Sequence, residues 1–204
     1  MRICTGLVAV LFAWGAAVQA GATEEAVFEV VESDGAFEIR EYASQIVAEV
    51  YIDDFDDSSG QGFRTLFKYI SGENRSQAKI PMTAPVSQEA ASEKIAMTAP
   101  VGQEQEGDRW LFSFMMPADY TMDTVPEPLN EDIRLREIPA RRVAAVRYSG
   151  RWSGARYEEH KAALEAWLEA KGLTPAGEPV WARYNAPFMP WFLRRNEVLI
   201  PLQP

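Results

Sequence analysis

Apolar and polar residues alternate in two stretches of the chain that match each other at a fixed offset. Phe37–Tyr42 (FEIREY) corresponds to Ile133–Ile138 (IRLREI) 96 positions later, and Val47–Val50 corresponds to Val143–Val146 at the same offset. A period of two residues is typical of a strand that buries one of its faces. The pattern therefore predicts two equivalent pairs of strands, one early in each half of the chain.

An amphipathic helix is predicted after the first pair of strands. Ser58 or Ser59 can cap a helix that runs from about Gly60 to Ile70, and Gly72 can end it. Apolar residues recur there at positions i, i+3, i+4 and i+7, which is the spacing of one helix face. They are Phe63, Leu66, Phe67 and Ile70.

A longer helix is predicted at the equivalent place in the second half. Ser153 can cap it, and Gly172 can end it after about Lys171. One side of this helix is apolar and consists of Tyr157, Leu164, Trp167 and Leu168. Both halves thus follow the same order of strands and helix.

Two more strands are predicted after each helix, from runs of β-branched and aromatic residues. They cover residues 80–86 or 95–101 and 110–116 in the first half, and 180–184 and 197–201 in the second. We expect an α+β fold, a distorted antiparallel β-barrel of two similar β-hairpin, helix, β-hairpin halves with both helices packed outside. The halves span about 26–116 and 133–203 within a single domain, since neither has enough strands to cover its own faces.

The phrase Lys79–Val86 (KIPMTAPV) returns almost unchanged as Lys94–Val101 (KIAMTAPV). Proline favours extended backbone at the residue before it and cannot donate to a strand ladder, so each phrase fits a strand that ends or lies at an edge. The two copies would pair as a hairpin with residues 87–93 as its loop. Met82 and Met97 are then adaptable core residues, or one copy lines a ligand pocket beside the first helix.

The first 20 residues resemble a secretory signal. Arg2 precedes an apolar run from Leu7 to Ala17, and Val18-Gln19-Ala20 has the small-x-small form of a cleavage site. The run is shorter than the roughly 20 residues that span a bilayer, so a permanent anchor is the weaker interpretation. We expect cleavage after Ala20 and a periplasmic or secreted mature chain of residues 21–204.

Composition excludes several classes of chemistry. Cys4 is the single cysteine and lies in the predicted signal, so the mature chain has no thiol nucleophile, iron–sulfur ligand or cysteine zinc site. His160 is the single histidine, which excludes a multi-histidine metal site. The net charge of −10 becomes −11 once Arg2 is removed, and it disfavours nucleic acid and anionic membrane surfaces as partners.

Three motifs resemble the SOUL haem-binding protein family. They are the MTAPV phrase, the helix that ends in Phe67–Gly72 (FKYISG), and Ala182–Trp191 (ARYNAPFMPW) running into Arg194–Val198 (RRNEV). The match extends from about Ala26 to Pro201. The resemblance implies a distorted antiparallel barrel with two helices, a haem or other tetrapyrrole as ligand, no established catalytic residue and, we expect, a monomer that makes no stable membrane insertion after signal cleavage.

The resemblance also places the ligand beside the first helix. Phe63 and Phe67 would form an apolar wall with Lys68 next to it, although a four-residue apolar stripe is also typical of ordinary core. The remaining candidate contacts are Met82, Phe188, Met189 and Trp191. Met189 replaces a basic residue that some relatives carry in this loop, which puts one propionate contact in doubt.

His160 is a weak candidate for an axial iron ligand. It follows Tyr157 by three residues and precedes Leu164 by four, which places it on or beside the packed face of the second helix. The family's proposed histidine lies near an early strand, where this chain has none. We therefore expect weak ligation by Met, Tyr or water, or no axial protein ligand.

Other charged residues have structural interpretations. Arg194 and Arg195 could bind a ligand carboxylate, but pairing with Glu197 or capping of backbone carbonyls is favoured. Arg40 with Glu41, and Arg136 with Glu137, are predicted to be solvated cross-strand pairs.

Two other classes of function remain open. The domain could bind another apolar molecule, or it could be a hydrolase-like enzyme of the wider barrel superfamily, with Glu197 or Glu178 acting beside a tyrosine.

Overall fold

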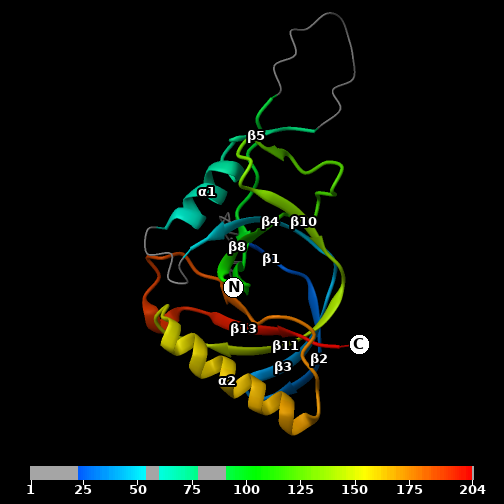
Figure 1. The fold of residues 1–204 in the computed structure, drawn as a ribbon, viewed down its shortest axis with the longest axis vertical. Coiled ribbons are helices and arrows are strands. Elements are labelled where there is room, and N and C mark those ends of the chain that lie inside the picture. The colour runs from blue at the N-terminus through cyan, green and yellow to red at the C-terminus, as the bar shows by residue number, and fades with distance from the viewer. Residues whose placement is uncertain (1–22, 54–59, 78–90, 204) are drawn as a thin grey trace, which may run out of the picture.

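The computed structural model describes residues 23–53, 60–77 and 91–203. Two α-helices, α1 (Gln61–Ile70) and α2 (Gly154–Lys171), and a short 3₁₀ helix, η1 (Trp191–Leu193), lie outside a large curved sheet (Figure 1). The sheet contains β2 (Phe28–Asp34), β3 (Phe37–Tyr42), β4 (Gln45–Ile52), β7 (Val101–Glu106), β8 (Arg109–Met115), β10 (Arg134–Ile138), β11 (Arg141–Tyr148), β12 (Val180–Arg183) and β13 (Asn196–Pro201). The short strands are β1 (Glu24–Glu25), β5 (Asn74–Arg75), β6 (Thr98–Ala99) and β9 (Glu127–Pro128).

The sheet is antiparallel throughout and open, with the order β10-β4-β8-β7-β12-β13-β11-β3-β2. Apart from β2, this order is symmetric about the β7–β12 pair. The two strands matched in sequence at an offset of 96, β3 and β10, occupy equivalent places, as do β4 and β11. The α+β, barrel-like architecture predicted from the sequence is confirmed.

In the prediction, each half opens with one hairpin of two consecutive strands. In the structure, these strands exchange partners between the halves instead of pairing with each other. β3 pairs with β2 and β11, whereas β4 pairs with β8 and β10. Only Ala43 and Ser44 connect β3 to β4, and only Pro139 and Ala140 connect β10 to β11. Such short connections require the two edges of the sheet to lie close together, so the curvature of the open sheet is set by its own topology.

Both helices cover the outer face of the sheet. α1 packs on β4 and β8, and α2 packs on β11 and β13. Buried side chains form one core under α1, around Leu66, Phe112 and Phe114, and another under α2, around Leu164 and Trp181. A third cluster, which includes Tyr42 and Leu199, lies on the inner face. None of the helices among the described residues is long and apolar enough to span a bilayer.

The helix ends follow local chemistry where the structure describes them. The Ser153 hydroxyl accepts a hydrogen bond from the Arg156 amide, and Gly172 ends α2 with φ of +68°, as predicted. α1 begins after Gly60, whose φ is +62° and which supplies no side-chain cap. The predicted caps Ser58 and Ser59 lie outside the described residues.

The two copies of the repeated phrase have different outcomes. The first copy, residues 79–86, lies outside the described part of the chain, so the predicted hairpin stays a prediction. In the second copy, Thr98 and Ala99 form β6 and pair in parallel with Glu24 and Glu25. The Thr98 hydroxyl donates to the Met115 carbonyl oxygen, which fixes this copy on β8.

Candidate functional site

A cavity of about 510 Å³ lies between the start of α1, the second copy of the repeated phrase and the segment after β12. Its lining comes from parts of the chain that are distant in sequence: Thr23, Gly60, Phe63, Arg64, Met97, Thr98, Ala99, Val101, Phe112, Trp152, Arg183, Tyr184, Asn185, Ala186 and Pro187. Ligand sites of small molecules have volumes of roughly 300–1,000 Å³. The cavity is therefore large enough for a sizeable organic ligand.

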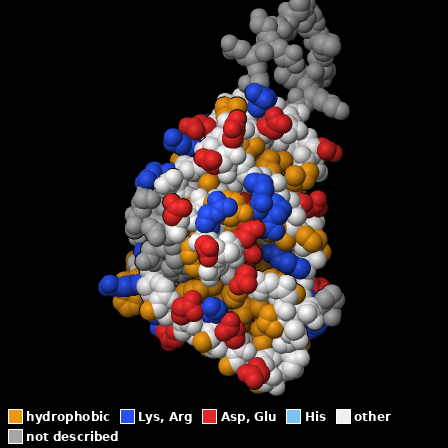
Figure 2. Space-filling model, viewed as in Figure 1, with side chains coloured by type: hydrophobic (Ala, Val, Ile, Leu, Met, Phe, Trp, Pro, Cys, Tyr) orange, Lys and Arg blue, Asp and Glu red, His pale blue; other side chains and the backbone are white. Residues whose placement is uncertain are grey.

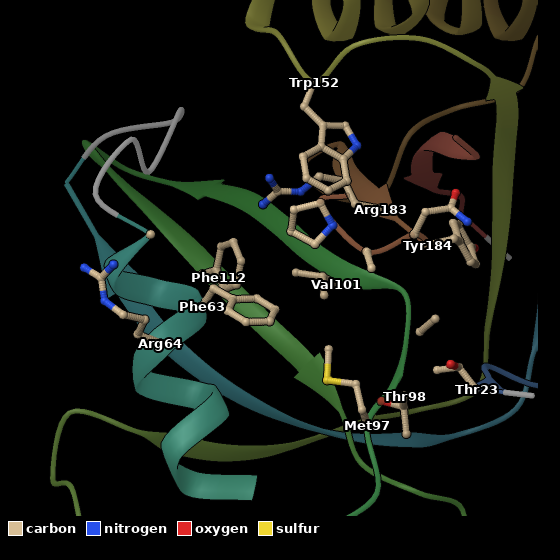
Figure 3. A pocket seen from close by; sticks show the side chains of 15 residues that line it. Thr23, Phe63, Arg64, Met97, Thr98, Val101, Phe112, Trp152, Arg183 and Tyr184 are labelled. Carbon is tan, nitrogen blue, oxygen red and sulfur yellow. The ribbon is translucent and has the colours of Figure 1, made fainter. Parts of the chain in front are cut away.

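Aromatic and aliphatic side chains form most of the cavity wall. Figure 3 shows Phe63 projecting from α1 toward Val101 and Met97, with Trp152 on the opposite side. Phe63 contacts Phe114 edge to face at a centroid distance of 5.4 Å, which fixes its ring against the core. The Trp152 indole is held by a hydrogen bond of 2.8 Å from Nε1 to Asn196 Oδ1. The wall is thus apolar and held in place on both sides.

Two cations lie at this cavity. The Arg183 guanidinium lies over three aromatic rings, those of Phe112, Trp152 and Trp181, at 4.9–5.3 Å from their centroids. Its Nη2 donates to Gln103 Oε1 at 3.1 Å, and this hydrogen bond orients the guanidinium group. Arg64 lies at the rim, with its side chain extending away from the Phe63 ring (Figure 3). Both can bind a carboxylate of a ligand that enters between them.

The cavity offers one soft donor atom for a metal-containing ligand, the Met97 thioether. Tyr184 also lines the cavity, but its hydroxyl donates to the buried carboxylate of Glu197 at 2.8 Å. Burial, followed by the charge of Glu197, raises the pKa of Tyr184. The tyrosine is therefore held in its neutral form. Its oxygen is a poorer iron ligand than a phenolate would be.

His160 belongs to α2 and lies in another part of the molecule. Its ring stacks on Tyr148 with centroids 3.9 Å apart, and its Nε2 is buried with no hydrogen-bond partner among the described residues. Burial, and then the charge of Arg156, lowers the pKa of His160. His160 does not line the cavity. Its position matches the packed role that the sequence favoured.

The other predicted site residues that the structure describes do not line the cavity. Phe67 is half exposed and stacks on Phe63 with centroids 5.8 Å apart, so it supports the wall from outside. The Lys68 side chain is exposed, and its Nζ lies 3.8 Å from Glu73 Oε1. Phe188, Met189 and Trp191 belong to the loop that continues from Pro187, but none of the three is a lining residue. Met82 lies outside the described residues.

Glu197 lies at the centre of a buried polar cluster next to the cavity. Its carboxylate accepts hydrogen bonds from Arg40 Nη1 (2.7 Å), Arg40 Nη2 (3.1 Å), Arg195 Nε (3.0 Å) and the Tyr184 hydroxyl (2.8 Å). The predicted pairing of Arg195 with Glu197 is confirmed. Arg194 donates to the carbonyl oxygens of Met189 and Pro187, which is the predicted capping role.

The prediction that Arg40 is a solvated partner of Glu41 is wrong. Arg40 is 2% exposed and binds Glu197 across β11, which lies between β3 and β13. Arg136 likewise binds Glu49, through Nε at 2.7 Å, instead of pairing with Glu137 in solvent. Glu49 is itself buried, and Arg134 also donates to it.

Two smaller cavities differ in chemistry from the first. One of about 350 Å³ has the carboxylates of Glu24, Glu25 and Glu137 among its lining residues, which would repel an anionic ligand. The other, of about 60 Å³, lies inside the sheet beside Glu104 and Arg141 and is too small for a macrocycle. The 510 Å³ cavity alone among these three combines size, apolar walls and cations.

The comparison with known families gives a match over nearly all of the described fold. The model of the family described as "SOUL heme-binding protein" matches residues 23–201. The chain belongs to the SOUL heme-binding protein family. It is 26% identical to human heme-binding protein 2, over 87% of this chain and 93% of that protein. It is 29% identical to heme-binding protein 1 of Xenopus laevis, over 82% of this chain and 84% of that protein.

Solved structures share the fold of this SOUL protein at low sequence identity. The C-terminal domain of EcmrR superposes with a TM-score of 0.53 at 12% identity, over 87% of this chain and 98% of that domain. A hydrolase from Listeria innocua superposes with a TM-score of 0.55 at 11% identity, over 85% of this chain and 94% of that protein. Identities this low support a common architecture, and function does not transfer with them.

Sequence reasoning missed four residues of the SOUL protein's cavity that matter most for its chemistry. The sequence analysis treats Met97 only as one of two equivalent methionines, places Phe112 and Arg183 in predicted strands and gives Trp152 no role. The available signal was the run Ala182–Trp191, since Arg183 and Tyr184 begin this family motif. The positions of Phe112 and Trp152 depend on strand pairing and carry no local signal.

Proposed function

We propose that this protein binds haem or a related tetrapyrrole, without catalysing a reaction, in the 510 Å³ cavity beside α1. The observation that carries the proposal is the composition of that cavity: rigid aromatic walls, two arginines and one thioether in a single space. A tetrapyrrole needs a broad apolar surface for its ring and cations for its carboxylates. Membership of the SOUL family supports the same ligand class.

The residues present fit the chemistry of such a ligand. Phe63 and Trp152 would lie against the macrocycle, and Arg183 and Arg64 would bind its carboxylates. Haem, when bound, would supply an iron atom, and Met97 is the lining residue whose thioether could hold it. Because a thioether is a weak ligand and no histidine lines the cavity, we expect weak protein ligation of the iron.

We also propose that the protein acts outside the cytoplasm. The support is the order of charge, apolar run and small residues in positions 1–20. A chain that loses Cys4 with this segment has no thiol to be oxidised in such a compartment.

An enzymatic role receives less support from the side chains. Glu197, the strongest sequence candidate for an acid or base, is 0% exposed and is held by Arg40, Arg195 and Tyr184. Burial alone would raise the pKa of Glu197, but the hydrogen bond and charge of Arg40, followed by the charge of Arg195, hold it below its ordinary value of 4.5. Such a carboxylate is a poor base, and Glu178 is exposed on the surface. Binding of another apolar molecule is the alternative in the same cavity.

Titration of the mature chain with hemin tests the proposal. We expect a shifted and sharpened Soret band together with quenching of tryptophan fluorescence, because Trp152 lines the cavity. Iron-free protoporphyrin should also quench the fluorescence, since the walls bind the ring and not the metal. A chain that changes neither signal with either ligand does not have the proposed function.

A further inference from the structure

Basic residues gather on one edge of this acidic molecule. Residues 147–156 (RYSGRWSGAR) and 183–195 (RYNAPFMPWFLRR) contain six arginines and no acidic residue, although the whole chain has 30 acidic and 20 basic side chains. The two segments lie against each other, since Arg151 lies over the Trp191 ring at 5.9 Å and Arg194 lies over the Trp152 ring at 4.3 Å. Carboxylates outside the two segments pair with two of these arginines, Glu159 with Arg156, and Glu25 and Glu197 with Arg195. Arg151 and Arg194 form no ion pair with a carboxylate of the described residues, so they give this edge a local positive charge.

The same edge exposes large apolar side chains next to these arginines. Phe188 is 88% exposed and Leu193 is 61% exposed, and Trp191 and Phe192 are each at least half exposed. All four belong to one loop between β12 and β13, which lies at the left edge of the molecule in Figure 1, where Figure 2 shows hydrophobic side chains next to basic ones. Exposed apolar residues are usually scattered singly, so four in one loop indicate a contact surface. We call Arg151, Phe188, Trp191, Phe192 and Leu193 the aromatic edge.

The loop that carries the aromatic edge is fixed by its own backbone contacts. Arg194 donates from Nε to the Met189 carbonyl oxygen at 2.8 Å and from Nη2 to the Pro187 carbonyl oxygen at 2.7 Å. The Met189 and Leu193 amides donate to the carbonyl oxygens of Ala186 and Pro190. These contacts already hold the apolar side chains outward. Burial of the side chains against a partner therefore costs no further loop entropy.

We propose that the aromatic edge docks on the surface of a lipid bilayer that contains anionic headgroups. Trp and Phe side chains favour the boundary between headgroups and acyl chains, and arginines beside them bind lipid phosphates. A second copy of the chain is a poorer occupant, because a two-fold contact would bring Arg151 and Arg194 against the same arginines. The net charge of the whole molecule does not oppose this contact, since charges farther than about 8–10 Å are screened.

The position of the edge relates it to the cavity. Asn185, Ala186 and Pro187 line the cavity, and Phe188 follows them directly on the aromatic edge. Docking would therefore bring the mouth of the cavity close to the bilayer, where an apolar ligand concentrates. The binding surface itself does not depend on which ligand the cavity takes.

Flotation with vesicles tests the inference on the chain from Gly21 onward, which contains the whole described fold. We expect the protein to float with phosphatidylcholine vesicles that contain phosphatidylglycerol, more weakly with phosphatidylcholine alone, and less as salt is raised. Leu193→Ser should weaken binding roughly three- to tenfold, because one exposed leucine no longer enters the interface. Arg151→Gln should weaken binding to the anionic vesicles and leave binding to neutral vesicles unchanged.

Matched variants elsewhere on the surface separate this contact from general stickiness. Leu129→Ser changes a leucine of similar exposure, 57%, and Arg109→Gln changes an arginine that lies over the Tyr51 ring. Neither should affect flotation, and all four variants should bind hemin as the parent chain does.

Three results would overturn the inference. One is no flotation with either kind of vesicle. Another is an equal loss for Leu129→Ser and Leu193→Ser. The third is a dimer in light scattering that Leu193→Ser dissociates, which would assign the edge to a second copy.

Discussion

Arg40 and Glu197 are 157 positions apart in the chain and form a two-bond ion pair on the inner face of the sheet. The pair spans β11, which lies between β3 and β13. Tyr42 accepts a hydrogen bond from Arg40 Nη1 at 3.1 Å, and Tyr184 and Arg195 complete the bonding of the carboxylate. A carboxylate from the last strand thus ties an early strand to the segment that lines the cavity.

Removal of Arg40 should therefore destabilise the fold strongly. Arg40→Ala leaves Glu197 buried without its main partner, and we expect a loss of about 3–5 kcal/mol in the free energy of unfolding, measured with urea. Arg75→Ala is the matched control, because Arg75 and Glu127 form an exposed pair at 3.4 Å. Its effect should stay below about 1 kcal/mol. Equal losses in both variants would contradict the structural role of the buried pair.

The same pair predicts acid sensitivity. Because the pKa of Glu197 is lower in the folded state than its ordinary value of 4.5, the unfolded state binds the proton more readily at acid pH. The stability that Glu197 contributes is present above pH 4.5 and is lost as the pH falls through the folded-state pKa. Urea unfolding at a series of pH values should show this decline. In Glu197→Gln, which is less stable at neutral pH, the decline should be shallower, and an unchanged slope would refute the assignment.

The cavity wall predicts the effect of charge on ligand binding. Phe63→Asp places a carboxylate against the macrocycle without a partner, which costs several kcal/mol, so hemin affinity should fall by at least about a hundredfold. Circular dichroism must first show a native fold, since Phe63 also packs against the core. Phe67→Leu, on the outer side of Phe63, should weaken binding by only about 1 kcal/mol. A folded Phe63→Asp chain that binds normally would place the site elsewhere.

Iron ligation can be tested with two single substitutions. His160→Ala should leave the hemin spectrum unchanged, because His160 packs on Tyr148 beneath α2. Met97→Leu keeps the volume of the side chain and removes the sulfur, so it should alter the Soret band of hemin and leave protoporphyrin binding within about threefold. Loss of the Soret shift in His160→Ala would move the site to α2.

Export can be tested directly in the native host. Mass spectrometry of the purified protein should find Gly21 at the N-terminus, as expected from cleavage after Ala20. An intact Met1 on protein recovered from the cytoplasm would disprove this prediction.

Local patterns predicted both helices and most of the strands, but they missed β2 and placed a strand at 95–101, where the structure has the short β6 and β7 starts only at Val101. Ser153 and Gly172 define the ends of α2, and alternation in Phe37–Tyr42 defines β3, because each signal depends on neighbouring residues alone. Strand order could not be predicted in the same way. Two-residue connections such as Ala43–Ser44 usually make hairpins, and here the pairing energy of two separate strands decides the outcome.

The same limit applies to the candidate site. Phe63 was found because it belongs to a helix face and to a recognised motif. Trp152 and Arg183 come together only through the pairing of β12 with β13 and the hydrogen bond of Trp152 to Asn196. Arg40 was misread because alternation predicts which face a side chain occupies. Alternation does not predict whether that face is exposed to solvent or buried.

Strand exchange between the halves has a consequence for how the chain reaches its native state. Within the first half β2 pairs with β3 and β4 pairs with β8, but β3 also pairs with β11, and β10 pairs only with β4 of the other half. The strand pairs that join the halves connect residues about 100 positions apart, so the entropy of closing such long loops is lost before these pairs are gained. Synthesis of the first half alone leaves a chain with unpaired edges, so folding completes only when β13 has been made.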